Sequence, residues 1–335
     1  MQVGQPDLFI LDGQAWPAEN RGAMMGHTTR LGTTDLVVSR LCLGGNVFGW
    51  TADESNSFAV LDAFAAAGGN FIDTADTYSS WVPGHVGGES ESIIGRWMAA
   101  RGNRSSMVIA TKVGMLPTLK GLAPATIRTA VEGSLRRLGV DRIDLYYAHR
   151  DDPDTPMADT LRAFDGLVKD GKVRHVAASN YTAPRLREAL ALSRRDRLVE
   201  YVALQPHYNL MHRQEYEGEL QGVCVAAQVA CLPYFSLAMG FLTGKYRPGS
   251  TVQSPRAGGA SKYLDERGIG ALAVLDDIAA AHRTAVSGVA LAWLAAQPTV
   301  VAPIASARTV AQLTELLPML GLALTGEEVK RLSSL

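Results

Sequence analysis

The chain repeats one local pattern along most of its length: a short apolar run, a polar turn, and a segment of helical periodicity that ends at glycine. One such segment places Ile127, Val131, Leu135 and Leu138 on one helix face and stops at Gly139. The apolar runs are residues 39–43, 70–73, 107–111, 143–147, 173–178, 201–204, 229–234 and 299–302. Strands that alternate with helices pair in parallel, so the pattern predicts eight strand and helix pairs in one α/β domain.

Two segments precede this repeat. Residues 28–41 alternate around Gly32 and Asp35, which predicts a short N-terminal β-hairpin. Residues 1–26 show no sustained period, and we expect them to form an extension outside the domain. The remaining residues, 27–335, fit the length of a single barrel of strands and helices, with further helices at the C-terminal end.

The position of polar side chains decides between a closed barrel and an open, doubly wound sheet. Several apolar runs end in a residue that could take part in chemistry: Asp73, Lys112, His149, Ser179, Asn180 and Gln205. In a barrel the carboxyl ends of all strands meet at one face, whereas an open sheet would spread these residues along a line. We therefore predict a (β/α)8 TIM barrel with its site at that face.

Charge and composition bear on the class of partner. The chain has 32 Lys and Arg against 33 Asp and Glu, a formal net charge of −1, and its basic residues are scattered. Proteins that bind nucleic acid or a membrane surface usually show a basic excess. We expect no nucleic acid and no membrane as a partner.

Two long stretches without charge, residues 220–244 and 284–307, are interrupted by prolines and glutamines, and we interpret them as buried barrel segments. Cys42, Cys224 and Cys231 have spacings that fit neither a zinc site nor a disulfide framework, so we expect buried free thiols and no metal. The N-terminus lacks the pattern of a secretory signal, and a cytoplasmic location is expected.

Four residues suggest a proton donor. A phenol such as Tyr78 has an ordinary pKa near ~10, and a neighbouring ammonium such as Lys112 favours its ionised form. Asp73 would hold that ammonium in place, and His149 would orient a substrate oxygen. The set suits protonation of a carbonyl oxygen, while the hydride that a reduction needs must come from a cofactor, because no side chain supplies one.

The glycine fingerprint of dinucleotide-binding folds is absent. Gly44, Gly45 and Gly49 have the wrong spacing, and residues 240–245 fall one residue short of a phosphate loop. Barrels commonly hold phosphate through the last loops that follow their strands. Arg308 and Thr309 lie at such a position, at the start of a predicted helix.

From about residue 28 to residue 335 the chain resembles the aldo-keto reductases. The resemblance rests on RLGTTDLVVSRLCLGG, NFIDTADTY, GGESESIIGRW, IATKVG, DLYYAHRDDP, VAASNY, LQPHYNLMHR, GFLTGKY and IASARTVAQL. It implies that Asp73, Tyr78, Lys112 and His149 are the catalytic tetrad. In that family Tyr78 would protonate the carbonyl of a small molecule while NADPH delivers hydride.

The resemblance also implies a set of cofactor contacts: Gly45, Asn46, Asp73, Ser179, Asn180, Gln205, Tyr234, Phe235, Leu237, Lys245, Arg256, Ser306, Arg308, Gln312 and Glu315. Ser179, Asn180 and Gln205 would hold the nicotinamide amide, and Tyr234 would stack beneath its ring. A loop with Leu237, Lys245 and Arg256 would cover the pyrophosphate. Arg308, Gln312 and Glu315 would lie at the adenosine end.

Within that set, Arg308 could pair with the 2′-phosphate of NADPH. The chain departs from the family's usual residues near the cofactor. Phe235-Ser236 replaces Ser-Pro, Ala305-Ser306 replaces Pro-Gly, and Leu316 replaces an asparagine. These departures leave NADH open as the alternative cofactor.

Phe48, Trp50 and Trp81 are the candidate substrate contacts, because together they could form an apolar wall, with Asp151 and Asp152 at another edge. The substrate would then be partly apolar, such as a sugar or a natural-product ketone. The physiological substrate and the oligomeric state stay open.

Two other functions compete with reduction. Lys112 could form a Schiff base in a lyase, but that lysine must be neutral, and Asp73 beside it would keep it charged. Some relatives of this fold bind NADPH while regulating a partner, so a sensor subunit with little turnover is the second alternative.

Overall fold

The computed structural model describes residues 27–335, so the extension expected at residues 1–26 lies outside the described residues. Eight parallel strands follow the order β11-β10-β9-β8-β5-β4-β3-β12. Their bounds are β3 (Cys42–Gly44), β4 (Phe71–Asp73), β5 (Val108–Val113), β8 (Ile143–Ala148), β9 (Val173–Ser179), β10 (Tyr201–Gln205), β11 (Ala230–Cys231) and β12 (Ile304–Ala305). Cys231 also donates to the carbonyl of Thr299 and accepts from the N–H of Val301. These bonds join the two ends of the sheet, and the predicted (β/α)8 barrel is confirmed.

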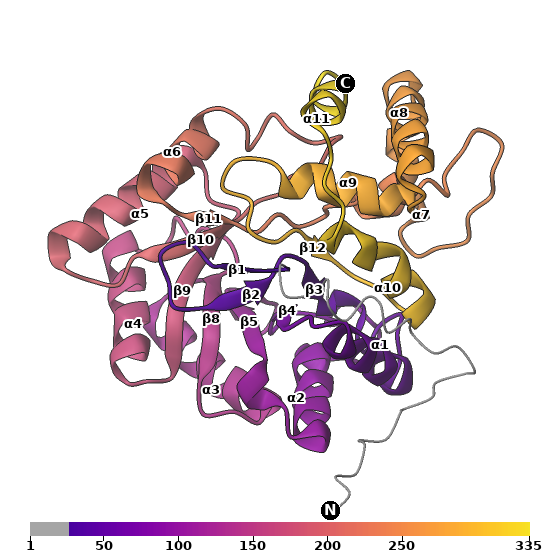
Figure 1. The fold of residues 1–335 in the computed structure, drawn as a ribbon. Coiled ribbons are helices and arrows are strands. Elements are labelled where there is room, and N and C mark those ends of the chain that lie inside the picture. The colour runs from indigo at the N-terminus through magenta and orange to yellow at the C-terminus, as the bar shows by residue number, and fades with distance from the viewer. Residues whose placement is uncertain (1–26) are drawn as a thin grey trace, which may run out of the picture.

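Helices surround the strands (Figure 1). Those that follow a barrel strand are α1 (Glu54–Ala66), α2 (Glu89–Arg101), α3 (Pro124–Leu138), α4 (Met157–Lys169), α5 (Ala183–Asp196), α6 (Glu219–Ala227), α9 (Val286–Ala295) and α10 (Val310–Leu316). The others are α7 (Ala257–Ala260) and α8 (Glu266–His282), in the long connection after β11, and the C-terminal α11 (Gly326–Ser333). Local sequence sets their ends: Pro124 opens α3, and Gly139 ends it with a left-handed φ of 64°.

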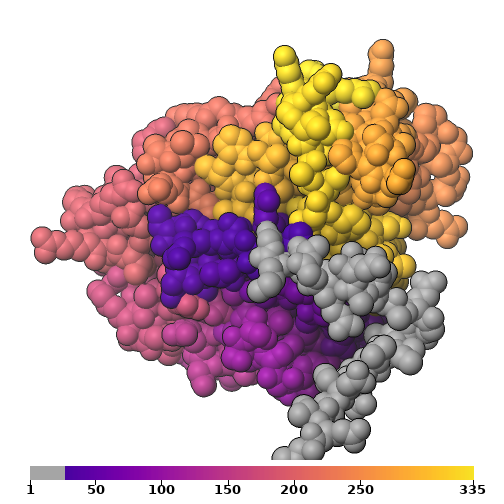
Figure 2. Space-filling model, in the orientation of Figure 1, coloured from indigo at the N-terminus to yellow at the C-terminus, as the bar shows by residue number. Residues whose placement is uncertain are grey.

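The predicted hairpin is present, with β1 (Thr28–Arg30) antiparallel to β2 (Val37–Ser39). Its side chains Leu31, Leu36 and Val38 are buried in the same cluster as the inward-facing residues of the barrel strands. The hairpin therefore covers the amino-terminal opening of the barrel, and it forms the indigo patch on the near face in Figure 2. A second, larger cluster fills the space between the strands and the helices.

The alternation of side chains along each strand positions the polar residues. Phe71 and Ala110 belong to the apolar cluster inside the barrel. Residues two apart on a strand point to the same face. Asp73 and Lys112 therefore point into the barrel one layer above them, at the carboxyl ends of β4 and β5.

The first and last strands differ from the prediction. Ser39 ends β2, so the first barrel strand begins at Cys42 rather than at residue 39. The last strand was expected at residues 299–302 but is Ile304–Ala305. Thr299 has a left-handed φ of 68°, and Pro303 has no N–H to donate, so regular pairing with β3 starts only beyond them.

Within residues 27–335, no single helix has the length and apolar character to cross a membrane. Helices α8 and α9 together have the necessary length and apolar character, but the chain bends by 98° between them. Nine of the ten residues of α9 are buried in the protein, which explains the long uncharged stretch in the sequence.

Candidate active site

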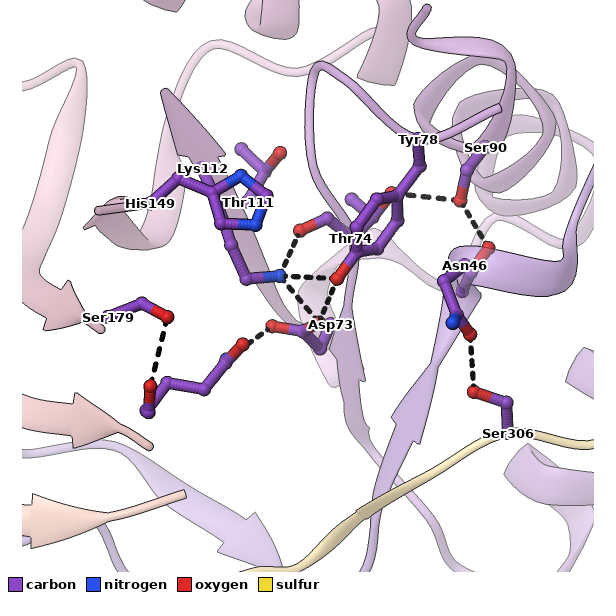
Figure 3. A network of polar contacts seen from close by, with 12 residues as sticks. Asn46, Asp73, Thr74, Tyr78, Ser90, Thr111, Lys112, His149, Ser179 and Ser306 are labelled. Carbon is purple, nitrogen blue, oxygen red and sulfur yellow. Dashed lines mark hydrogen bonds and ion pairs between the residues drawn. The ribbon is translucent and has the colours of Figure 1, made fainter. Parts of the chain in front are cut away.

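Lys112 is the centre of a buried polar network at the carboxyl end of the barrel (Figure 3). Its side chain is 0% exposed, and its Nζ lies 2.6 Å from Asp73 Oδ2. The same ammonium donates to the carbonyl oxygen of Thr74 at 2.7 Å and to the hydroxyl of Tyr78 at 2.9 Å. All three N–H donors of the lysine are therefore used, which fixes its position.

Tyr78 belongs to the turn that follows β4, and its hydroxyl donates to Asp73 Oδ2 at 3.2 Å. Burial raises the pKa of Tyr78 well above its ordinary value, and the negative charge of Asp73 adds to this effect. The expected net lowering of the phenol pKa is therefore not found in this structure, although Lys112 still favours the phenolate. The reason is that burial penalises the phenolate and the adjacent carboxylate repels it, so the hydroxyl keeps its proton.

His149 follows β8, and its ring centroid lies 6.1 Å from that of Tyr78. Burial lowers its pKa well below the ordinary value, and the positive charge of Lys112 adds to this shift. Its imidazole is therefore neutral at physiological pH. Nδ1 is buried and has no hydrogen-bond partner among the described residues.

A second network links the ends of β9 and β10 to the residues after β11. Gln205 donates its amide to Asp73 Oδ1 at 2.9 Å, and Ser179 donates to the carbonyl of Gln205 at 2.9 Å. Asn180 donates to the carbonyl of His149 and accepts from the hydroxyl of Tyr234 at 2.8 Å. Its φ of 57° is left-handed, which asparagine tolerates better than most residues. Asn180 also donates to Ser179 Oγ at 3.1 Å, which joins the four residues into one connected set.

A cavity of about 750 Å³ opens onto both networks. Its volume lies within the range of ligand-binding sites. Most of the predicted site residues line it: Asn46, Trp50, Asp73, Tyr78, Trp81, His149, Ser179, Asn180, Gln205, Tyr234, Phe235, Leu237, Lys245, Arg256, Ser306, Arg308, Gln312 and Glu315. Lys112 is buried directly behind Tyr78. The structure therefore brings residues from position 46 to position 315 together in one place.

Besides Lys112, two predicted site residues, Phe48 and Gly45, do not line the cavity. Phe48 is 0% exposed and packs in the core between the strands and helices, so the expectation that it walls the substrate space is wrong. Gly45 faces inward, where a Cβ would lie 2.8 Å from Ser90 Oγ, and Gly44 lines the cavity in its place. The 3-10 turn that starts at Gly45 changes the direction of the chain after β3.

Asp151 and Asp152 have structural partners instead of a place at the cavity. Asp151 forms an ion pair with Arg185, and Asp152 accepts hydrogen bonds from the backbone of Leu122 and the hydroxyl of Thr155. Met115 is a lining residue that the sequence did not indicate. It comes from a small hairpin after β5, and only its apolar character in a glycine-flanked segment could have suggested it.

Lys245, Arg256 and Arg308 are three cations along the other side of the cavity. Burial lowers the pKa of Lys245, and the charge of Arg308 adds to this effect. Burial likewise lowers the pKa of Arg256, whose guanidinium lies 5.7 Å from the centroid of the Trp50 ring. Among residues 27–335 none of these three side chains forms an ion pair, although the charge of Glu315, which also lines the cavity, opposes the lowered pKa of Lys245. The arrangement therefore favours an anionic ligand.

Asp76 is a buried carboxyl group below the Tyr78 turn that the sequence did not single out. Its side chain has no solvent exposure, and neither oxygen has a hydrogen-bond partner in the described part of the chain. Burial raises its pKa to about 8, with a further contribution from the negative charge of Glu91, and Arg137 opposes the shift. The folded protein thus holds a proton that the unfolded chain releases above its ordinary pKa of 3.8.

We expect Asp76→Asn to stabilise the protein at pH 8 but not at pH 4. Because the folded state binds the extra proton, the free energy of unfolding of the wild type falls as pH rises from about 4 to about 8. The neutral amide removes this loss, a gain on the order of 2 to 4 kcal/mol at pH 8. Urea denaturation at both pH values measures it, with the exposed Asp154→Asn as control. An equal effect at both pH values would contradict the assignment.

Comparison with known proteins gives a consistent result. The model of the aldo/keto reductase family matches residues 40–335. The chain is 34% identical to the uncharacterized oxidoreductase YrpG of Bacillus subtilis (strain 168), over 92% of this chain and 95% of that protein. It is 32% identical to a probable voltage-gated potassium channel subunit beta of Oryza sativa subsp. japonica, over 85% and 88%.

A third relative is a norsolorinic acid reductase of Aspergillus flavus, 31% identical over 88% of this chain and 77% of that protein. The family match covers all eight barrel strands and every residue that lines the cavity. The chain therefore belongs to the aldo/keto reductase family and is an NAD(P)H-dependent oxidoreductase.

Proposed function

We propose that the protein reduces an aldehyde or ketone on a small molecule with NADPH, and that Tyr78 gives the proton to the carbonyl oxygen. One observation carries the proposal: Tyr78 lines the cavity, and its hydroxyl accepts a hydrogen bond at 2.9 Å from Lys112 Nζ, whose residue does not line it. A proton donor with a charged partner on its protein side suits a reaction in which negative charge develops on the substrate oxygen.

The residues of the cavity fit NADPH. The cations Lys245, which is exposed, and Arg256 and Arg308, which are half-buried, would hold its phosphates, with Arg308 on the 2′-phosphate. The ring of Tyr234 would lie against the nicotinamide, and the amides of Asn180 and Gln205 would bind its carboxamide. When bound, the cofactor supplies the hydride that no side chain can supply.

The raised pKa of Tyr78 is compatible with its role as an acid. A hydroxyl that stays protonated throughout the neutral range is ready to donate in every turnover. After donation, the phenolate would be stabilised by Lys112, whose ammonium Asp73 holds at 2.6 Å. The neutral imidazole of His149 would donate a hydrogen bond to the substrate oxygen without bringing a charge.

The substrate would enter past an apolar rim. Trp81 is 49% exposed and Met115 is 36% exposed, although both are large apolar side chains. Trp50 and Trp81 pack edge to face, with their ring centroids 5.5 Å apart, and Trp81 also contacts the Tyr78 ring. These contacts support Trp50 and Trp81 as substrate-binding residues and a partly apolar substrate such as a natural-product ketone.

The test is NADPH oxidation by the full-length protein over a panel of aldehydes and ketones, with NADH compared for each active substrate. Turnover of at least one carbonyl compound is expected. Binding of NADPH without turnover would favour a regulatory or sensor subunit; the rice relative is named as a probable channel subunit. That role is not favoured here, because the chain is equally similar to reductases.

We expect Arg308→Leu to raise the KM for NADPH about 10- to 100-fold and to leave the KM for NADH within about twofold, because the arginine would bind only the 2′-phosphate. Steady-state kinetics with both cofactors measure this. The exposed Arg128→Leu on α3 serves as the control and should change neither constant. An equal rise in the KM for NADPH and the KM for NADH would show that Arg308 does not bind the 2′-phosphate.

A further inference from the structure

Behind Tyr234 lies a stack of two histidines that the proposed chemistry does not use. The His207 and His212 rings are nearly parallel, at 10°, with centroids 3.8 Å apart. On its other side His207 stacks on Tyr234, with centroids 5.4 Å apart and an angle of 25°. The three rings therefore form a continuous column in the order His212, His207, Tyr234.

The backbone holds this column together. His207 and Tyr234 are paired in a parallel β-bridge, and the N–H of Tyr234 donates to the carbonyl of Pro206. A tight turn folds His212 back onto His207, because Asn209 and His212 exchange backbone hydrogen bonds. The buried side chain of Asn209 also accepts from the N–H of His212 at 3.0 Å and donates to the carbonyl of Phe235 at 2.9 Å. The column is thus part of a rigid element.

Only one end of the column, the Tyr234 ring, faces the cavity. Tyr234 lines the cavity, whereas His207 and His212 do not, so the imidazole of His207 supports the tyrosine ring from behind. The hydroxyl of Tyr234 is fixed separately by Asn180 at 2.8 Å. Burial lowers the pKa of His207 to about 4, with a further contribution from His212. A neutral imidazole at physiological pH stacks without charge repulsion.

We infer that His207, held in place by His212, is a positioning residue that sets the plane of Tyr234 for the nicotinamide ring. This inference rests on the proposed function, in which Tyr234 lies against that ring. A preorganised ring costs less to order when the cofactor binds. Loss of one stacked pair corresponds to about a 3- to 10-fold change in binding.

The experiment compares His207→Phe with His207→Leu. Phenylalanine keeps a ring at this position, whereas leucine fills similar space without one. We expect the leucine variant to bind NADPH about 3- to 10-fold more weakly and the phenylalanine variant to bind it within about twofold of wild type. Fluorescence of bound NADPH measures the Kd, and thermal unfolding shows whether both variants are folded.

The fragment 2′-phospho-ADP-ribose, which lacks the nicotinamide, separates positioning from a general loss of the site. Its Kd should be the same for wild type and both variants. Equal weakening of fragment and NADPH, equal effects of leucine and phenylalanine, or an unchanged Kd for NADPH in the leucine variant would each overturn the inference. Wild-type protein that binds neither ligand would overturn the proposed function as well.

Discussion

Replacing Tyr78 with phenylalanine is expected to lower kcat by about 10²- to 10⁴-fold and to leave the Kd for NADPH within about twofold. Tyr78 lines the cavity, and its hydroxyl combines a retained proton with a charged partner, Lys112 Nζ, 2.9 Å away. Phenylalanine keeps the ring and its contact with Trp81. Single-turnover reduction of the most active panel substrate measures the chemical step directly.

The matched control for this variant is Tyr263→Phe. Tyr263 is half-buried and does not line the cavity, so loss of its hydroxyl should leave kcat within about twofold. Unchanged turnover in Tyr78→Phe would contradict the role of the phenol as proton donor. A parallel loss of NADPH binding would point instead to a collapsed cavity.

The sequence allowed the strand-end residues to be predicted because two simple rules act together. Parallel strands bring their carboxyl ends to one face, and alternation along each strand makes every second residue point inward. Asp73, Lys112 and Gln205 follow both rules, and the structure links them through hydrogen bonds of 2.6 and 2.9 Å. Once a closed barrel was predicted, the proximity of these three residues followed from it.

Residues in the loops were less predictable, because no periodicity governs them. Phe48 and Trp50 are two positions apart, yet Phe48 is buried in the outer core and Trp50 lines the cavity. Met115 reaches the cavity from a small hairpin, where its carbonyl accepts a hydrogen bond from the hydroxyl of Thr77 in the loop after β4. The sequence showed which side chains were large and apolar, but not which way each of them faced.

The pKa of Tyr78 was mispredicted for a related reason. A sequence indicates that a lysine and a carboxylate are near a phenol, but it does not give the depth of burial or the acceptor of the phenol proton. In the structure the hydroxyl donates to Asp73, so the carboxylate opposes the effect of Lys112. Before the reaction the Tyr78 hydroxyl therefore keeps its proton. The ammonium of Lys112 would stabilise the phenolate once the proton has been donated.

The buried ion pair between Lys112 and Asp73 leads to the second large prediction. We expect Lys112→Met to lower the free energy of unfolding by about 3 to 5 kcal/mol, because it leaves the Asp73 carboxylate buried without its cation. Asp73→Asn should also lower the free energy of unfolding, because it leaves the Lys112 ammonium buried without its carboxylate. The double variant should lose less than the sum of the two, because neither uncompensated charge remains. Urea denaturation of the four proteins gives a coupling energy, expected to exceed about 2 kcal/mol.

The exposed ion pair between Arg96 and Glu54 provides the matched control for this cycle. Its side chains are 54% and 49% exposed, and it has the same kind of short contact, at 2.8 Å. Water screens such a pair, so its coupling energy should be much smaller than that of the buried pair. Additive effects in the Lys112 and Asp73 cycle would mean that the two charges are solvated independently. The ammonium would then have no fixed position behind Tyr78, and the phenolate formed in the proposed reaction would lack its stabilising partner.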